Sequence, residues 1–201
     1  MKDRGTYKPL SYFQLMEVTL RELLVEKGLL TEEQIRKEVE DMRGRTPERG
    51  ARVVARAWMD SSYRSRLLEN GTKACEELGL DVPGLKLVVV ENTPQVHNVI
   101  VCTLCSCYPR MLLGIPPDWY KSRAYRSRMV REPRQVLREF GLEVDQGAQV
   151  RVHDSTADMR YLVLPMRPAG TEGWSEEKLA SLVTRDSMIG VSVPKSPGTR
   201  A

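Results

Sequence analysis

The first 80 residues carry hydrophobic side chains at helical spacing, with charged residues between them. A stripe from Phe13 to Leu24 predicts one helix, and Gly28 is placed to end it. Thr31 and Gln34 then form a capping-box pattern, which predicts that a second helix begins there. Because both stripes are narrow, these helices bury little apolar surface on their own.

Two more helices are predicted before residue 80. Thr46 and Pro47 open the third, with the proline at its first position, and the segment 67–79 forms the fourth. Helices with thin apolar faces depend on tertiary packing for their stability. Two arrangements of residues 1–80 stay open: a small bundle that caps the main domain, or an arm that packs on a partner subunit. We expect the arm.

The hydrophobic pattern changes after residue 80. A turn signal at 81–84 is followed by two β-branched apolar runs, 85–90 and 96–101, which predict buried strands. Further strands are expected at 150–152 and 161–164, and helices at 133–140 and 175–184. Helices and strands intermix without a regular β-α-β rhythm. The predicted fold class is therefore α+β, with a mixed, layered domain at 81–201 that carries a cysteine loop and the catalytic site.

Length and composition predict a folded, water-soluble chain. Of the 201 residues, 41% are hydrophobic and 29% are charged, which is enough to bury a core. No apolar run approaches the ~20 residues that cross a bilayer. The N-terminus lacks the apolar core of a secretory signal. We expect a cytoplasmic protein with no membrane partner.

The net charge of +4 is concentrated in one segment. From Arg110 to Arg138 there are eight basic and two acidic residues, which makes this segment +6 and leaves the rest of the chain at −2. An excess of cations along the whole chain would favour nucleic-acid binding. A local excess favours an anionic site or an acidic partner surface, and we expect no nucleic-acid partner.

Three of the four cysteines, Cys102, Cys105 and Cys107, lie within six residues, too close together to join distant loops. In a reducing compartment such a cluster indicates metal binding or redox chemistry. Two thiolates and the amide nitrogens of Ser106 and Cys107 can surround one ion through five- and six-membered chelate rings, with Cys102 as an axial ligand. These donors suit a trivalent ion and leave one position open. The alternative is a closed zinc site with His97 as fourth ligand.

The cysteine motif belongs to a longer resemblance. After about residue 20 the chain resembles the α subunit of nitrile hydratase, which converts a nitrile and water into an amide. The resemblance is carried, in order, by LVEKG (24–28), GARVVARAW (50–58), VVENT (89–93), VCTLCSC (101–107), GIPPDWYKS (114–122), RSR (126–128), REPR (131–134) and RPAGTEGWS (167–175).

The resemblance assigns roles within the loop. It implies that Cys102 is the axial thiolate, that Cys105 becomes a sulfinic acid and Cys107 a sulfenic acid, and that the backbone nitrogens of Ser106 and Cys107 complete the site. Cys105 and Cys107 are the implied catalytic residues, because an oxidised sulfur acts on the nitrile carbon. Thr103 is similar to the cobalt-type members, so the expected metal is non-corrin Co(III), with Fe(III) as the alternative.

The resemblance also implies partners. A β subunit, present as one chain or split in two, supplies arginines that hydrogen-bond the oxidised sulfurs and closes the pocket. An activator protein loads the metal. The small-molecule partner is a nitrile. Thiocyanate hydrolase is a relative whose metal-binding γ subunit this chain also resembles, and it is the alternative function. An alternative of another class is a non-catalytic, zinc-binding scaffold protein.

The sequence departs from the family next to the cysteines. The family commonly has Tyr-Pro-Trp-Pro there, whereas this chain has Arg110 and Met111 in place of the last two residues. A cation and a flexible thioether favour a bulky or polar nitrile, such as a heteroaromatic or nucleoside nitrile, and Arg110 also suits the thiocyanate anion. The substrate-pocket candidates are Arg110, Met111, Trp119 and Tyr120. Glu91 and Thr103 are candidates for orienting the metal ligands from behind.

Overall fold

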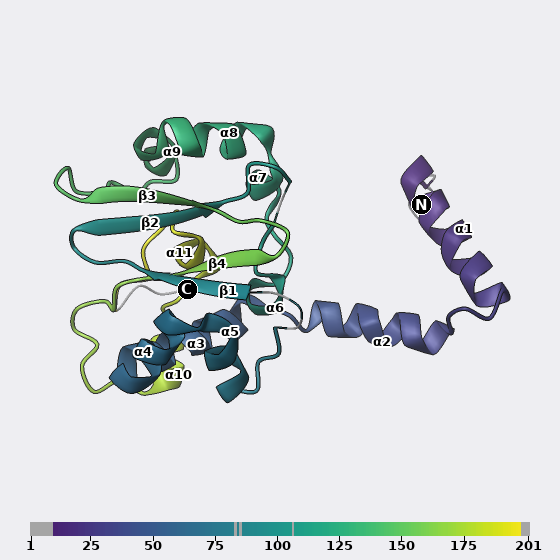
Figure 1. Ribbon diagram of the computed structural model, residues 1–201, viewed down its shortest axis with the longest axis horizontal. Helices are drawn as coiled ribbons and strands as arrows, with labels where there is room; N and C mark the ends of the chain where they lie inside the picture. The colour runs from purple at the N-terminus through teal and green to yellow at the C-terminus, as the bar shows by residue number, and fades with distance from the viewer. Residues whose placement is uncertain (1–9, 83, 85, 106, 198–201) are drawn as a thin grey trace, which may run out of the picture. The chain divides into compact units, whose positions relative to one another are not determined.

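The computed structural model describes residues 10–82, 84, 86–105 and 107–197 (Figure 1). It contains two compact units, Met1–Gly44 and Arg45–Ala201. The boundary expected near residue 80 differs from this division. The physical reason is burial: Val54 and Leu67, both in the predicted arm, have no exposed surface and belong to the same hydrophobic core as the strands.

The first unit contains two helices, α1 (Tyr12–Glu26) and α2 (Glu32–Arg43). The capping box predicted at Thr31 is present, since its hydroxyl accepts from the Gln34 amide at 3.1 Å and its own amide donates to the Gln34 side chain at 2.8 Å. No residue of α1 or α2 is buried. These helices are therefore held by local hydrogen bonds and not by a core of their own.

The second unit begins with three helices, α3 (Pro47–Met59), α4 (Ser61–Glu69) and α5 (Gly71–Glu77). The single helix predicted at 67–79 is wrong. Asn70 is extended, with φ −148° and ψ 91°, and its side chain accepts from the Lys73 amide at 3.1 Å. An asparagine that caps a new helix ends the previous one at the same point.

Four strands form two parallel pairs. They are β1 (Lys86–Glu91), β2 (Val96–Val101), β3 (Gln149–Asp154) and β4 (Met159–Leu164). β1 pairs with β4 and β2 pairs with β3. All four predicted strands are confirmed, although Leu85 lies outside the described residues. Parallel pairing brings the carboxyl ends of two strands together. Val101, the last residue of β2, lies opposite Asp154, the last residue of β3. The chain therefore enters the cysteine loop beside Asp154.

Helices cover the strand pairs from both sides. Figure 1 shows α8 (Arg123–Arg131) and α9 (Pro133–Glu139) beside the β2–β3 pair, and α3, α4, α5 and α10 (Glu176–Ala180) beside the β1–β4 pair. Short helices α6 (Arg110–Leu113), α7 (Asp118–Lys121) and α11 (Arg185–Ile189) complete the unit. The helix predicted at 133–140 is present, whereas the one predicted at 175–184 ends at Ala180. The α+β class is confirmed. Of the helices described, none is long and apolar enough to cross a membrane.

Candidate metal centre

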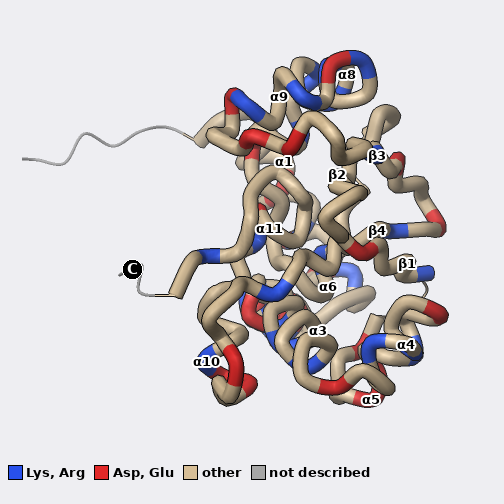
Figure 2. Tube along the Cα trace, turned by 90° about the vertical axis from the view of Figure 1, so that its left-hand side faces the viewer, with Lys and Arg blue, Asp and Glu red and all other residues tan. Residues whose placement is uncertain are grey.

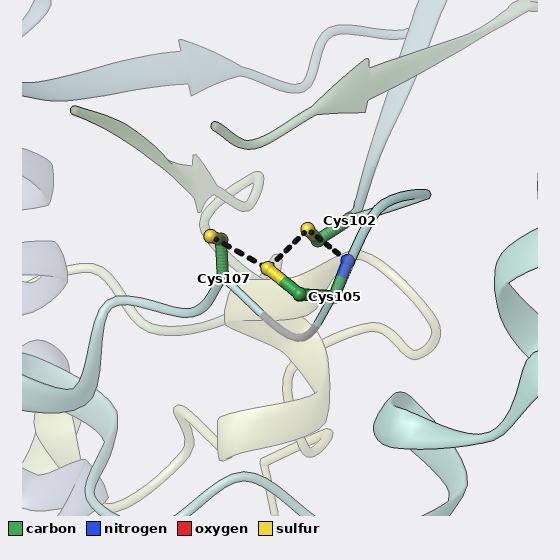
Figure 3. Close-up of side chains that lie close together, drawn as sticks. All are labelled: Cys102, Cys105 and Cys107. Carbon is green, nitrogen blue, oxygen red and sulfur yellow. Dashed lines mark hydrogen bonds between the residues drawn. The ribbon is translucent and has the colours of Figure 1, made fainter. Parts of the chain in front are cut away.

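The three clustered cysteines follow β2 directly. Cys102 is 1% exposed, Cys105 is exposed and Cys107 is half-buried. Figure 3 shows the three sulfur atoms turned toward one another from a short stretch of loop. The Sγ atom of Cys105 lies 3.4 Å from that of Cys102 and 3.2 Å from that of Cys107, and all three lie within 4.8 Å of one another. The three cysteines that the sequence predicted as a cluster therefore lie close together in space.

The sulfur separations allow a test of which ion fits. Two sulfurs bound at about 2.3 Å to one ion lie about 3.3 Å apart when they subtend a right angle and about 3.8 Å apart in a tetrahedron. The observed 3.2 and 3.4 Å are close to the right-angle value. Right angles between ligands are typical of octahedral and square-planar centres. Two of the three sulfur pairs are therefore spaced as in such a centre, and closer than in a tetrahedral zinc site.

Two backbone nitrogens, those of Ser106 and Cys107, were predicted to bind the metal beside the sulfurs. Ser106, whose amide nitrogen was expected to bind the metal, lies outside the described residues. The amide of Cys105 donates to the Cys102 sulfur at 3.3 Å, which bends the loop back on itself. The ligand roles of Ser106 and of the Cys107 amide stay predictions.

Asp154 fixes the start of the loop. Its carboxylate accepts the Thr103 amide at 2.9 Å and the Thr103 hydroxyl at 2.5 Å. The Thr103 carbonyl in turn accepts from Arg126 of α8 at 3.3 Å. All of the polar backbone groups of Thr103 are therefore satisfied by residues far away in sequence, and the loop between Cys102 and Cys105 is held between β3 and α8.

The far side of the loop is held by an aromatic residue. Tyr120, which is fully buried, donates its hydroxyl to the Cys107 carbonyl at 2.9 Å. Tyr108 packs edge-on against the Tyr120 ring, with 5.1 Å between the centroids. Burial raises the pKa of the Tyr120 hydroxyl well above its ordinary value, so it remains a donor at neutral pH.

The environment of Cys107 keeps its thiol protonated in the absence of a cation. Burial, together with hydrogen bonds that the Cys107 thiol donates to the Cys105 and Cys102 sulfurs, raises the pKa of Cys107 to about 12, and the nearby Arg160 opposes this rise. A bound multivalent cation inverts such a balance and drives the thiol to the thiolate. The Cys107 thiol therefore becomes an anionic ligand only when an ion is present.

The structure places the pocket candidates differently. Arg110 is exposed at the start of α6, and Met111 is half-buried against the core. Trp119 is half-buried and packs edge-on against Tyr125 and Phe140, with centroid separations of 4.9 and 4.7 Å. Of the four, Tyr120 alone has a described hydrogen bond to the cysteine loop. Whether these residues line a substrate pocket stays a prediction.

His97 and Glu91 are engaged away from the sulfurs. The Nε2 atom of His97 lies 2.7 Å from the Gly190 carbonyl oxygen, and its Nδ1 atom lies 3.4 Å from the side-chain nitrogen of Asn92. Since a carbonyl only accepts, Nε2 carries the proton and Nδ1 accepts. Both ring nitrogens are therefore occupied, which leaves neither as the fourth ligand of a closed zinc site. The Glu91 carboxylate pairs with Arg64 at 2.5 Å.

Three residues near the site were missed by sequence reasoning: Asp154, Arg126 and Arg160. Each is distant from the cysteines in sequence and reaches them through strand register or helix packing. The motif RSR at 126–128 contained one of them, but nothing in its spacing indicated the contact. An acidic residue at the end of a strand is a weak signal without knowledge of which strand lies beside it.

Comparison with known proteins gives a match over almost the whole chain. A family model described as nitrile hydratase, alpha chain, matches residues 11–192. The cobalt-containing nitrile hydratase subunit alpha of Pseudonocardia thermophila is 53% identical over 180 residues, 88% of each chain. The thiocyanate hydrolase subunit gamma of Thiobacillus thioparus is 45% identical over 209 residues, 98% of this chain and 86% of the relative.

Solved structures agree with these matches. A recombinant thiocyanate hydrolase comprising partially modified cobalt centres superposes with a TM-score of 0.88 at 42% identity, over 96% of each chain. A double mutant of the Fe-type nitrile hydratase from Comamonas testosteroni Ni1 gives a TM-score of 0.88 at 43% identity, also over 96% of each chain. The fold is thus shared by proteins described with cobalt and with iron.

Proposed function

The chain belongs to the alpha-chain family of nitrile hydratase, and from that membership we propose that it is the catalytic α subunit of a cobalt-type nitrile hydratase. The reaction adds water across a carbon–nitrogen triple bond: the oxygen of water becomes the carbonyl oxygen of the product amide, and both of its hydrogens end on the nitrogen, which becomes the NH₂ group. The observation that carries the proposal is the convergence of three thiols, within 4.8 Å, at the end of β2.

The metal we propose is non-corrin Co(III). Cobalt is named for the Pseudonocardia relative, and the Fe-type structural neighbour keeps iron as the alternative. Cys102, Cys105 and Cys107 would hold the ion, together with the amide nitrogens of Ser106 and Cys107. Such an ion, when bound, supplies a Lewis acid that polarises the nitrile.

The chain's own residues supply the rest of the chemistry. Cys105 is proposed to become a sulfinic acid and Cys107 a sulfenic acid, both rungs of the thiolate oxidation series, with dioxygen as a suitable oxidant. The oxygen on Cys107 acts on the nitrile carbon as nucleophile or as base toward water. Thr103, held by Asp154, and the Cys107 carbonyl, held by Tyr120, keep the loop in one conformation while this happens.

The substrate we propose is a bulky or polar nitrile. Support comes from Arg110, an exposed cation three residues after Cys107, where an aromatic wall was expected from the family. The second candidate function is thiocyanate hydrolysis by a γ-type subunit. It is favoured by the 98% coverage of this chain by the thiocyanate hydrolase relative and by the suitability of a guanidinium for a small anion.

The partners we propose are a second, β-type subunit, as one chain or two, and an activator protein that loads the metal. Relatives named as subunits alpha and gamma support a heteromer. The N-terminal unit supports it as well, because α1 and α2 have no buried residue and expose large apolar side chains such as Phe13, at 79%. We propose that this unit packs on the partner subunit.

The decisive experiment uses the complex co-expressed with the neighbouring gene products. We expect amide formation from a nitrile panel, cobalt in the complex, and about three added oxygen atoms on Cys105 and Cys107 by intact and peptide mass. We expect Cys107→Ala to abolish turnover. Cys75→Ala, which removes a cysteine buried on α5, should leave turnover unchanged. Carbonyl sulfide from thiocyanate without amide formation would move the chain to the second function. Zinc with unmodified cysteines and no turnover would identify a scaffold.

A further inference from the structure

A groove of about 730 Å³ lies between the cysteine loop and α8. The loop contributes Thr103 and Leu104, the two residues between Cys102 and Cys105. Anything bound in the groove would therefore touch the loop from outside, on the side that Arg126 already contacts through the Thr103 carbonyl.

The helical wall of the groove is one continuous face of α8. Its residues stand at positions i, i+3, i+4, i+7 and i+8, the spacing of a single helical stripe. They are Arg123, Arg126, Ser127, Val130 and Arg131. The other side of α8 carries Tyr125 and Met129, which are buried in the core. The packing of α8 thus leaves this stripe free for another molecule.

The groove holds three cations without anions. Within the part of the chain that the structure describes, Arg123, Arg126 and Arg131 form no ion pair with a carboxylate. Arg126 donates to the Thr103 carbonyl, and Arg131 donates to the Ser127 carbonyl at 3.1 Å. Figure 2 shows the concentration of basic residues on α8 and α9. A neutral carbonyl satisfies hydrogen bonds but does not offset the charge of a guanidinium.

Arg128, on the same helix, differs from these three arginines because carboxylates of this chain neutralise its charge. It pairs with Glu132 at 2.5 Å and with Glu139 at 2.6 Å, and these bonds tie α8 to α9. The chain therefore supplies carboxylates where an arginine serves its own structure. Their absence from the groove indicates that the partner charges come from elsewhere.

The groove also exposes apolar side chains. Leu104 is 86% exposed and Val130 is 46% exposed. Arginine and large apolar residues side by side are the composition of protein interfaces, where arginine is enriched and lysine is depleted. Nucleic-acid surfaces bring cations to a phosphate backbone and gain nothing from an exposed leucine at their centre.

We propose that this groove docks a segment of the second subunit that carries at least two carboxylates on either side of a large apolar side chain. The inference rests on the proposed heteromer and adds the place and chemistry of one of its contacts. The carboxylates pair with Arg123 and Arg131, and the apolar side chain packs on Leu104 and Val130. Docking there covers the outer side of the loop between Cys102 and Cys105.

The test compares charge reversals inside and outside the groove in the co-expressed complex. The groove variant is Arg123→Glu with Arg131→Glu; Arg126 is kept because it holds the Thr103 carbonyl. The matched control is Arg138→Glu, an exposed arginine of the same basic segment that does not line the groove. Leu104→Ser tests the apolar contact. Binding of each purified α chain to the partner chain that co-purifies with it is measured at low and high salt, and thermal unfolding of each isolated variant confirms that it folds.

We expect the groove variant and Leu104→Ser each to raise the Kd for the partner chain by about tenfold or more. The groove variant should also lose the salt dependence of binding, and Arg138→Glu should stay within about twofold of the unchanged protein. Equal affinity for the groove variant would overturn the inference while leaving the heteromer and its catalysis intact. A groove variant that binds its partner normally but loses salt-sensitive RNA binding would assign the groove to nucleic acid instead. Failure of any partner to co-purify would refute the proposed function, which is a separate result.

Discussion

Asp154 accepts two hydrogen bonds from one residue of the cysteine loop, the amide and the hydroxyl of Thr103. Both bonds require an acceptor, and a carboxylate offers two oxygens that only accept. An asparagine would turn one of these oxygens into a donor and place it against a donor. The loop therefore requires an acidic residue at position 154, because another polar side chain would not offer two acceptor oxygens.

Asp154→Asn is expected to loosen the loop without unfolding the protein. Losing one charged hydrogen bond and leaving a donor unsatisfied costs about 1–3 kcal/mol. We expect cobalt content and nitrile turnover of the complex to fall several-fold, and the thermal midpoint of the second unit to fall by a few degrees. Asp158→Asn, at an exposed acidic residue four positions on, serves as the control. Unchanged cobalt content in Asp154→Asn would show that the loop does not depend on this pair.

At the residue scale, the sequence predicted the cysteines but not their supports. Cys102, Cys105 and Cys107 are close in sequence, so a loop that bends back on itself can bring their sulfurs together. Asp154 is 52 residues from Cys102 and becomes its neighbour only because β2 and β3 pair in parallel with Val101 opposite Asp154. Strand pairing and register are set by the whole core, which no local pattern encodes.

Among the elements, α7 contributes a buried hydroxyl to the site. Tyr120 is surrounded by Tyr108, Trp119 and Tyr125, and its hydroxyl reaches the Cys107 carbonyl. The structure thus gives Tyr120 a hydrogen bond that supports the loop, and the pocket-lining role expected of it stays a prediction. The two roles make different kinetic predictions.

Tyr120→Phe keeps the ring packing and removes only the hydrogen bond to the Cys107 carbonyl. Leaving that carbonyl without its partner costs about 1–3 kcal/mol at the loop. We expect a lower kcat and a lower thermal midpoint of the complex, with KM for the nitrile within about twofold of its original value. The control is Trp119→Phe on the same helix, which replaces the indole by a smaller ring and leaves the hydrogen bond to the loop in place. A rise in KM with an unchanged kcat in Tyr120→Phe would instead mean that the hydroxyl meets the substrate.

Element boundaries show where pattern reasoning reached its limit. The capping box at Thr31 and the proline at the start of the helix from Pro47 were correct because these signals are local. The break at Asn70 was missed because hydrophobic spacing continues through it, and the Asn70 side chain was not weighed as a cap. The position of the unit boundary depends on the burial of α3 to α5 in the strand core, which helical periodicity alone does not reveal.

Across the second unit, a buried polar network joins the two strand pairs. Asn92, just after β1, accepts the Asn98 amide of β2 at 2.7 Å, and Asn98 lies 2.8 Å from the Nε2 atom of His153 on β3. His97 adds its bond to the Gly190 carbonyl at the end of α11. A Cβ atom at Gly190 would overlap the Asn98 carbonyl, so this close approach requires glycine. Two histidines therefore lie inside this network, which joins the strand pairs of the second unit.

This network predicts how stability depends on pH. Burial lowers the pKa of both His97 and His153 from the ordinary 6.5, with the Gly190 hydrogen bond opposing the change at His97. A histidine with a lowered folded-state pKa favours folding in its neutral form, so its contribution is present above pH 6.5 and is lost as pH falls through the folded-state pKa. We expect the free energy of unfolding, measured by denaturant titration, to decrease from about pH 7 to about pH 5.

The double variant His97→Gln with His153→Gln should flatten this dependence, since the carboxylates whose pKa values are lowered, such as Glu77 and Glu139, start from 4.5 and act only at lower pH. The variant will be less stable at neutral pH, so the slope of stability against pH is the relevant readout and not its absolute value. A slope that is the same as in the unchanged protein would place the pH dependence elsewhere.

The N-terminal unit gives the last prediction, because its helices form without a core. The apolar side chains of α1 are exposed: Phe13 by 79%, Leu20 by 58% and Leu23 by 43%. Replacing Leu20 and Leu23 by serine removes no buried contact, so the unfolding midpoint of the isolated chain should not change. If the unit packs on the partner subunit, the same double variant should raise the Kd of the α chain for its partner at least about tenfold, since burying each leucine contributes about 1.5–3 kcal/mol. Glu17→Ser with Glu22→Ser, two charged positions of α1, is the control for helix propensity. Loss of stability in the isolated chain, with partner affinity unchanged, would show that α1 packs on its own chain instead.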